Sequence, residues 1–266
     1  MPEGAVLAFL LTLGAGLSTT LGALVAMSRR PVSDRFLSTA LGFSAGVMIY
    51  VSFVEILPEA GRQIGEVLGA EQAAWTTTAG FFGGIAVIGL IDRFVPGPAN
   101  PHEVPPTQRD AADREARALL RMGMLTAVAI GMHNFPEGFA TFITALEHPE
   151  IGIPVAVAIA IHNVPEGIAV AVPIRRATGS RRTALRWAFL AGLAEPAGAV
   201  LGYLLLAPFL TPTVTGLALA AVAGVMVFIS LDELLPTAEA YGHHHRSIYG
   251  LLAGMAVMAL SLLLLS

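Results

Sequence analysis

Hydrophobic residues in this chain form long blocks separated by short polar segments, and each block is long enough to cross a lipid bilayer. A membrane-spanning α-helix needs about 20 consecutive, mostly apolar residues. Eight blocks meet this requirement, at residues 5–27, 36–58, 74–95, 120–145, 150–174, 185–207, 213–237 and 247–265. The pattern predicts an all-α integral membrane protein with eight transmembrane helices, in which residues 1–266 form a single transmembrane domain.

The composition supports this interpretation. Of the 266 residues, 55% are hydrophobic and 13% are charged, whereas soluble domains are about 25% charged. The mean hydropathy is +0.72. The first residues lack the positive charges of a signal peptide, so we expect the first block to remain as a membrane helix. The chain has no cysteine, which excludes disulfides and thiolate metal sites.

The arginines are distributed unevenly between the two sides of the predicted bundle. All fifteen basic residues are arginine, and fourteen of them fall between blocks one and two, three and four, five and six, and seven and eight. Arg62 is the exception. Because connections rich in arginine stay in the cytoplasm, both termini are predicted to face outward. The polar, proline-rich segment 97–118 is then a cytoplasmic loop.

The sequence also contains an internal repeat. Residues 45–60 are echoed at 223–238, at a constant offset of 178 positions, and the matches include Met48 with Met226 and Glu55 with Glu233. A weaker echo matches Gly80 and Gly84 to Gly250 and Gly254. Blocks two and seven must cross the membrane in opposite directions, so the repeat is inverted and the predicted arrangement is a 3+2+3 bundle. Inverted repeats are typical of secondary transporters.

Blocks four and five carry one polar motif twice. The motif reads His-Asn-Phe-Pro-Glu-Gly at 133–138 and His-Asn-Val-Pro-Glu-Gly at 162–167. Each helical residue advances by about 100°, so the glutamate lies between the histidine and the asparagine on one face. Each glutamate could therefore bridge two metal ions. With Glu195, a further carboxylate beside a proline in block six, the candidate metal ligands are His133, Asn134, Glu137, His162, Asn163, Glu166 and Glu195.

No arginine lies in the interior of any predicted span, so the three carboxylates near mid-membrane have no fixed counter-charge. Ionised carboxylates in that environment need a bound cation or a proton. Imidazole and carboxylate ligands without sulfur anions favour zinc, iron, manganese, cobalt or nickel over monovalent copper, and the two histidines make calcium a poor fit. The expected activity is therefore transport of divalent metal ions or protons.

Further polar residues mark a predicted route to and from this site. Glu55 lies in the outer half of block two and Glu59 at its outer end, whereas Asp232 and Glu233 lie in the inner half of block seven. Met48 could act as a soft ligand, although packing is the more common role of a buried methionine. The histidine run could accept metal on the inner side or could simply be solvated. The predicted route residues are Glu55, Glu59, Met48, Asp232, Glu233, His243, His244 and His245.

With these motifs, the chain resembles the ZIP (zinc-regulated, iron-regulated transporter-like) family of divalent metal transporters, and in particular its bacterial zinc-uptake branch. The resemblance covers nearly the whole chain and implies a protein of the bacterial inner membrane that moves metal into the cytoplasm. It also implies a binuclear site and an elevator-type motion of one helix group. By resemblance, one metal position would use His133, Glu137, His162 and Glu166, and the other Asn134, Glu137, Asn163, Glu166 and Glu195.

The predicted function is therefore transport of zinc, and also of iron, manganese, cobalt or cadmium, without ATP, since no Walker-type phosphate loop is present. The predicted partners are metal ions and the bilayer, with no nucleic acid and no cofactor other than the transported ion. An intramembrane zinc metalloprotease is an alternative, but the required His-Glu-x-x-His is absent. A proton-coupled carrier of an organic substrate is another. Proton coupling, metal preference and a homodimer packed through small-residue faces remain open.

Overall fold

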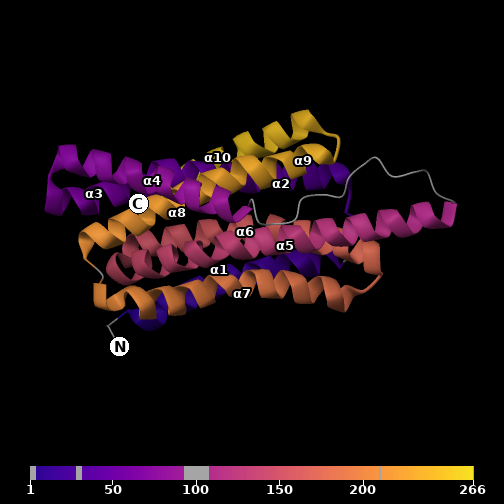
Figure 1. Cartoon of the computed structure of the whole chain (residues 1–266), viewed down its shortest axis with the longest axis horizontal. Coiled ribbons are helices and arrows are strands. Elements are labelled where there is room, and N and C mark those ends of the chain that lie inside the picture. The colour runs from indigo at the N-terminus through magenta and orange to yellow at the C-terminus, as the bar shows by residue number, and fades with distance from the viewer. Residues whose placement is uncertain (1–3, 28–31, 93–107, 210, 266) are drawn as a thin grey trace.

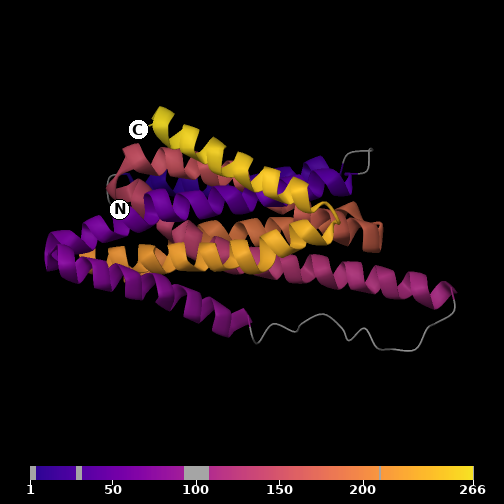
Figure 2. The same cartoon turned by 90° about the horizontal axis from the view of Figure 1, so that it is seen from above.

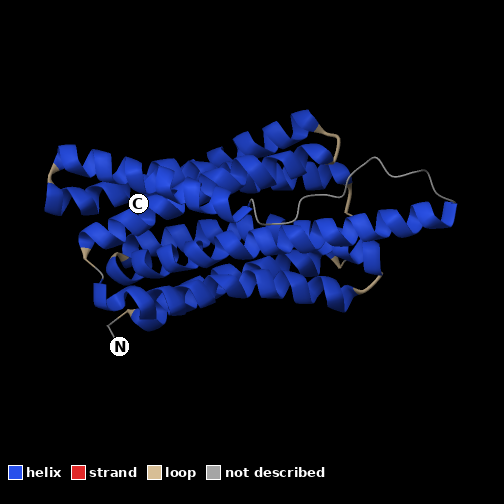
Figure 3. Ribbon diagram, viewed as in Figure 1, coloured by secondary structure: helices blue, strands red, loops and turns tan. Residues whose placement is uncertain are grey.

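A computed structural model describes residues 4–27, 32–92, 108–209 and 211–265, and within these ranges the chain is an all-helical bundle without strands (Figure 1, Figure 3). The prediction of an all-α chain is confirmed for these residues. The elements are α1 (Ala5–Ala26), α2 (Asp34–Val51), η1 (Ser52–Ile56), α3 (Leu57–Leu68), α4 (Ala70–Asp92), α5 (Gln108–Glu147), α6 (Pro149–Thr178), α7 (Arg181–Leu206), η2 (Ala207–Phe209), α8 (Pro212–Ile229), η3 (Ser230–Leu234), α9 (Leu235–Ala240) and α10 (His244–Leu265).

Most of the predicted spans correspond to helices with the length and composition of membrane spans. Among the described residues, seven helical segments qualify: Ala5–Ala26, Asp34–Leu68, Ala70–Ile91, Pro149–Thr178, Arg181–Leu205, Pro212–Ala240 and His244–Leu264. The remaining predicted block, 120–145, lies within α5. Because α5 begins at Gln108, the second half of the predicted loop 97–118 is helical, whereas residues 93–107 lie outside the described ranges.

The helix of the second predicted span continues beyond the predicted end at residue 58, through η1 and α3 to Leu68. Pro58 is the second residue of α3 and directly follows the π-helical segment η1. Beyond it, α3 buries only Ala60, Gln63 and Ile64. The apolar run therefore ends before the helix does.

The two ends of the bundle differ in the connections they carry. The start of α1, the end of α10, and the turns from α3 to α4 and from α5 to α6 lie at one end in both views (Figure 1, Figure 2). The connections from α6 to α7 and from α9 to α10 lie at the other end. The arginines of those two connections are therefore at the end opposite the described ends of the chain.

The internal repeat is visible as two matching π-helical segments, η1 (Ser52–Ile56) and η3 (Ser230–Leu234). Ser52 Oγ donates to the Met48 carbonyl, and Ser230 Oγ to the Met226 carbonyl, each at 2.7 Å. A proline follows each segment in the first turn of α3 or α9, and a proline cannot donate the hydrogen bond that an α-helix needs. Short π-helical segments are frequent at functional sites.

Glycines divide the helices into two groups. Group 1 contains α1, α5, α6 and α7, and group 2 contains α2 with η1 and α3, α4, α8 with η3 and α9, and α10. Wherever a Cβ added to a described glycine would come within 3 Å of another helix, that helix belongs to the same group. The contacts with main-chain carbonyls in group 1 are Gly16–Gly192, Gly22–Val164, Gly138–Glu195, Gly167–Thr19 and Gly198–Phe135, and those in group 2 are Gly42–Ser247, Gly46–Leu251, Gly84–Ala221, Gly216–Ala60, Gly224–Phe81, Gly250–Thr39 and Gly254–Phe43.

The group 2 contacts follow the repeat pair by pair. Gly46 packs on the Leu251 carbonyl, and the equivalent Gly224 packs on the carbonyl of Phe81, which corresponds to Leu251. The glycines of the weaker echo also make equivalent contacts, since Gly84 packs on the backbone of α8 and its counterpart Gly254 packs on the backbone of α2. These small-residue faces are thus used within the chain, and they supply no support for the homodimer that the sequence left open.

Replacing Gly84 with alanine is expected to destabilise the bundle, whereas the same change at Gly83 is not. A Cβ at Gly84 would clash with the backbone of Ala221 on α8, while a Cβ at Gly83 meets no atom within 4 Å. Overpacking of a tight contact costs about 1–3 kcal/mol, and each kcal/mol lowers the melting temperature by about 2–4 °C. Thermal unfolding of the two purified variants in detergent tests this, and equal melting temperatures would contradict the tight packing of α4 on α8.

Candidate metal centre

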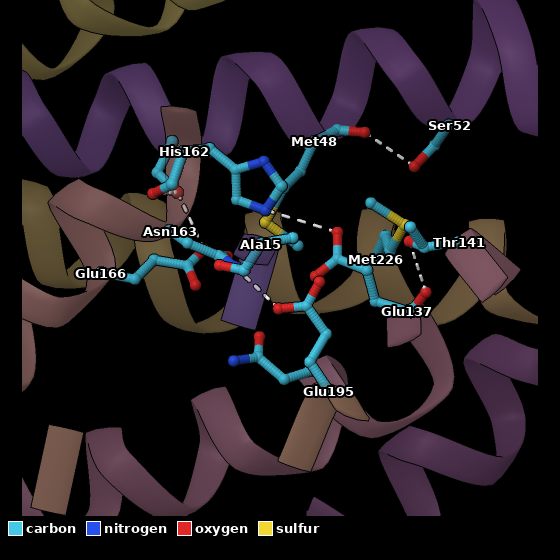
Figure 4. Close-up of polar contacts among 12 residues, drawn as sticks. Ala15, Met48, Ser52, Glu137, Thr141, His162, Asn163, Glu166, Glu195 and Met226 are labelled. Atoms are coloured by element: carbon cyan, nitrogen blue, oxygen red, sulfur yellow. Dashed lines mark hydrogen bonds and ion pairs between the residues drawn. The ribbon is translucent and has the colours of Figure 1, made fainter. Parts of the chain in front are cut away.

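Six of the seven predicted ligands have described side chains, and all six are buried near the middle of group 1 (Figure 4). Asn134 and Glu137 come from α5, His162, Asn163 and Glu166 from α6, and Glu195 from α7, and none is more than 1% exposed. His133 is in α5, but its side chain lies outside the described part of the chain. Three adjacent helices therefore place amide, imidazole and carboxylate groups in the buried interior of group 1.

Glycines bring the ligand-bearing helices close together. Gly138 directly follows Glu137, and its Cα faces the carbonyl oxygen of Glu195 on α7. Gly167 directly follows Glu166 and packs in the same way on the backbone of α1. A Cβ at either glycine would clash with that backbone. The Glu-Gly pair in each motif therefore combines a ligand with the close helix contact that positions it.

The two asparagines are oriented by hydrogen bonds from their amide nitrogens. Asn134 Nδ2 donates to the Ala191 carbonyl at 3.1 Å. Asn163 Nδ2 donates to the Ala15 carbonyl and to Glu195 Oε2, both at 2.9 Å. With their nitrogens held in this way, both Oδ1 atoms are buried without a hydrogen-bond donor. An oxygen in that state is available to a cation.

The remaining side chains add further buried acceptors. Both carboxylate oxygens of Glu137, Oε1 of Glu195 and both ring nitrogens of His162 have no hydrogen-bond partner. His162 Nε2 lies 3.3 Å from Glu137 Oε1, without hydrogen-bond geometry. Each buried polar atom that lacks a partner costs about 1–3 kcal/mol. A bound cation would satisfy several of these atoms at once, and zinc takes nitrogen and oxygen ligands of these types.

The described side chains do not by themselves complete a three-residue ligand set. Among the described side chains, no three histidine, aspartate or glutamate residues are close enough together to hold one ion. The side chain of His133 is not part of this comparison. The amide oxygens of Asn134 and Asn163 are not of those types, and both are buried without a hydrogen-bond partner. The chemistry of the site therefore fits a metal ion, and the assignment of individual ligands belongs to the proposal below.

The predicted outer residues connect to the site through a cavity. Glu55 and Glu59 line the same narrow cavity as Glu137, together with Thr141 and Thr144. Glu59 is paired with Arg62, whose Nη2 lies 2.6 Å from Glu59 Oε1. The outer carboxylates of Glu55 and Glu59 therefore border the same cavity as the predicted ligand Glu137.

Met48 belongs to a fully buried hydrophobic cluster that also contains its repeat equivalent Met226. Both methionines are drawn with the polar site in Figure 4. Their burial agrees with the packing role, although a packed methionine can also contact an ion through its sulfur.

The predicted inner residues are less buried than the candidate ligands. Asp232 and Glu233 are in η3, at a less buried position. His243, His244 and His245 are at the start of α10, where His244 Nδ1 lies 2.8 Å from Glu239 Oε1. The structure therefore does not bring the histidine run to the central site.

Ser44 is a site residue that sequence reasoning missed. Its Oγ donates to Glu166 Oε1 at 2.8 Å. The sequence did contain a signal, because Val222 occupies the equivalent position in the second repeat. A hydroxyl in only one of two otherwise matching apolar segments indicates a local polar partner.

Comparison with known proteins agrees with the resemblance in the motifs. Residues 97–262 match the family described as ZIP zinc transporter. A protein named zinc transporter ZupT from Corynebacterium glutamicum is 62% identical over 259 residues, which cover 97% of this chain and 98% of that protein. The ZupT proteins of Lysinibacillus sphaericus and Streptococcus mutans are 55% identical, over 100% of both chains, and 54% identical, over 97% of both chains.

Proposed function

Because this chain belongs to the ZIP family of zinc transporters, we propose that it carries zinc ions across the bacterial inner membrane into the cytoplasm. Membership of this family makes the protein a transporter rather than an enzyme. One structural observation carries the proposal: an apolar bundle interior holds buried amide, imidazole and carboxylate atoms that lack hydrogen-bond partners. Such atoms are costly in a membrane interior and by default mark a functional site.

We place two adjacent zinc positions at this site. His133, Glu137, His162 and Glu166 hold the first, and Asn134, Glu137, Asn163, Glu166 and Glu195 hold the second. The two shared glutamates bridge the ions. Support comes from the orientation of the asparagines, whose amide nitrogens are anchored so that their oxygens remain as acceptors. The carboxylates replace the hydration shell of the ion and neutralise its charge.

The chain is oriented in the membrane with both termini outside, as a 3+2+3 bundle. The positive-inside rule supports this orientation, since the arginine-rich α6–α7 connection, and the α9–α10 connection with Arg246 next to it, lie at the end opposite the start of α1 and the end of α10. Zinc then enters past Glu59 and Glu55 and reaches Glu137 through the cavity that these three residues line. Glu233 and Asp232, followed by the histidine run, form the corresponding exit.

Transport occurs by an elevator motion in which group 1 carries the site along group 2. Glycine contacts hold each group together internally, and none of the close contacts described above joins the two groups. Where the groups meet, alanines from group 1 (Ala140, Ala158 and Ala169) pack in one cluster with Met48 and Met226 of group 2. Small side chains against adaptable methionines form a smooth surface. A surface of this kind allows one rigid group to slide past the other.

The function can be tested with purified protein in liposomes that contain a zinc-sensitive dye. We expect the dye signal to rise when zinc is added outside, and vesicles without protein to show only leak. Iron, manganese, cobalt and cadmium added in competition would reduce the zinc signal if they share the site. Zinc binding without any flux above the leak would contradict transport, and peptide cleavage would then have to be examined.

A further inference from the structure

Ser44 lies at the boundary between the two helix groups, next to the proposed zinc ligands. It belongs to α2, in group 2, and its side chain is 0% exposed. Its Oγ lies 2.8 Å from Glu166 Oε1 and 3.4 Å from the carbonyl oxygen of His162, both in α6 of group 1. One hydroxyl of group 2 therefore contacts a proposed ligand that group 1 carries.

Two of the described buried serines donate outside their own helix: Ser38 donates to the main-chain carbonyl of His243, whereas Ser44 donates to a side-chain carboxylate. Ser18, Ser52, Ser230 and Ser247 each donate to a carbonyl three or four residues earlier in the same helical segment. That local bond satisfies a hydroxyl in a helix without any outside partner. Ser44 instead donates across to another helix. The packing does not require a hydroxyl here either, since Val222 fills the equivalent buried position in the second repeat.

Both partners of this hydrogen bond are held firmly by their own group. Gly42 and Gly46 stand on either side of Ser44 and pack directly on the backbone of α10. Gly167, next to Glu166, packs directly on the backbone of α1. The hydroxyl therefore follows group 2 and the carboxylate follows group 1. Because a hydrogen bond is lost once its atoms separate beyond about 3.5 Å, a small shift between the groups breaks this one.

We propose that Ser44 is a positioning residue that orients the Glu166 carboxylate for zinc, and that it does so only in the arrangement of the two groups seen here. The proposal rests on the function proposed above. The hydroxyl fixes Oε1 of Glu166, which sets the direction in which the carboxylate presents its lone pairs to the ion. When group 1 slides, Glu166 loses this support. Affinity for zinc thus differs between the two ends of the motion because of a residue that never touches the ion.

Zinc binding to detergent-solubilised protein tests this role without transport. Loss of a hydrogen bond to a metal ligand weakens metal affinity by about 10–100-fold, so Ser44→Ala is expected to raise the zinc Kd at least about tenfold. Ser52→Ala is the matched control, since it removes a buried hydroxyl from the same membrane span that bonds only to its own helix. Cobalt substituted for zinc gives a second readout, because its visible absorption depends on ligand geometry.

A double-mutant cycle separates positioning from a general loss of structure. If Ser44 acts through Glu166, Ser44→Ala adds no further loss of affinity and no change of the cobalt spectrum in a Glu166→Gln background. An unchanged Kd and spectrum for Ser44→Ala, or an equal loss in both backgrounds, would overturn the inference. His162→Ala distinguishes this from failure of the proposed function: if that variant still takes up zinc normally, the site itself is misassigned.

Discussion

Replacing either His162 or Glu166 with alanine is expected to reduce zinc uptake by proteoliposomes to the rate of vesicles without protein. Both side chains are fully buried in α6, and both are proposed ligands of the first zinc position. Removal of a ligand costs more than removal of the hydrogen bond that supports it, which is itself worth about 10–100-fold in affinity. The expected loss is therefore essentially complete, and it should appear both in the dye assay and in direct zinc binding.

A matched control for these variants is Glu150→Ala. Glu150 is a carboxylate of the same helix, but it lies in the first turn of α6 and is largely exposed. We expect this variant to retain uptake. All variants must elute as folded protein in detergent with melting temperatures near that of the wild type. Uptake at the wild-type rate by folded Glu166→Ala protein would rule out the central site as the transport site.

Linking the two helix groups covalently is expected to stop transport. Arg176 of group 1 lies 3.1 Å from Asp34 of group 2, and both side chains are about half exposed. The chain has no cysteine of its own, so Asp34→Cys combined with Arg176→Cys supplies two thiols and no others. A short reagent that joins two thiols should reduce uptake to the protein-free rate, because group 1 can then no longer slide. A reductant that cleaves the reagent should restore uptake.

The control for this experiment places the same link inside one group. Arg62 and Glu66 are both exposed, both belong to α3 of group 2, and form an ion pair. The double variant Arg62→Cys and Glu66→Cys should react with the same reagent and still transport zinc. If linking Asp34 to Arg176 leaves uptake unchanged, the two groups do not move relative to each other, and the elevator proposal fails although the zinc site stands.

The hydrophobic pattern predicted helix positions well and helix ends poorly. Seven predicted spans correspond to long apolar helices among the described residues, because burial in a bilayer demands a long apolar run. The helix containing α3 continues past Pro58 to Leu68, and in this part polar side chains (Glu59, Arg62, Gln63 and Glu66) interrupt the apolar sequence. An amphipathic extension of this kind needs no apolar run, so a search for such runs cannot find it.

The candidate site was predictable to the extent that its chemistry is repeated in the sequence. The two motifs contain the polar side chains that the structure buries in group 1. The orientation of the asparagines was not predictable, since it depends on the carbonyls of Ala15 and Ala191 on other helices. Ser44 was missed for the same reason. Its partner Glu166 lies 122 positions away, and only the folded chain brings them together.

The paired contacts in group 2 also bear on what drives net movement of the ion. The packing of α2 on α10 uses the same glycine contacts as the packing of α8 on α4. Group 2 therefore offers closely related surfaces toward either face of the membrane. Without bound zinc, the two end positions of group 1 should then have similar free energies, so the empty protein favours neither strongly. The driving force must come from outside the protein. For a doubly charged ion, the membrane voltage alone contributes roughly 4.6 kcal/mol for every 100 mV, and the difference in free zinc between the two compartments adds to it.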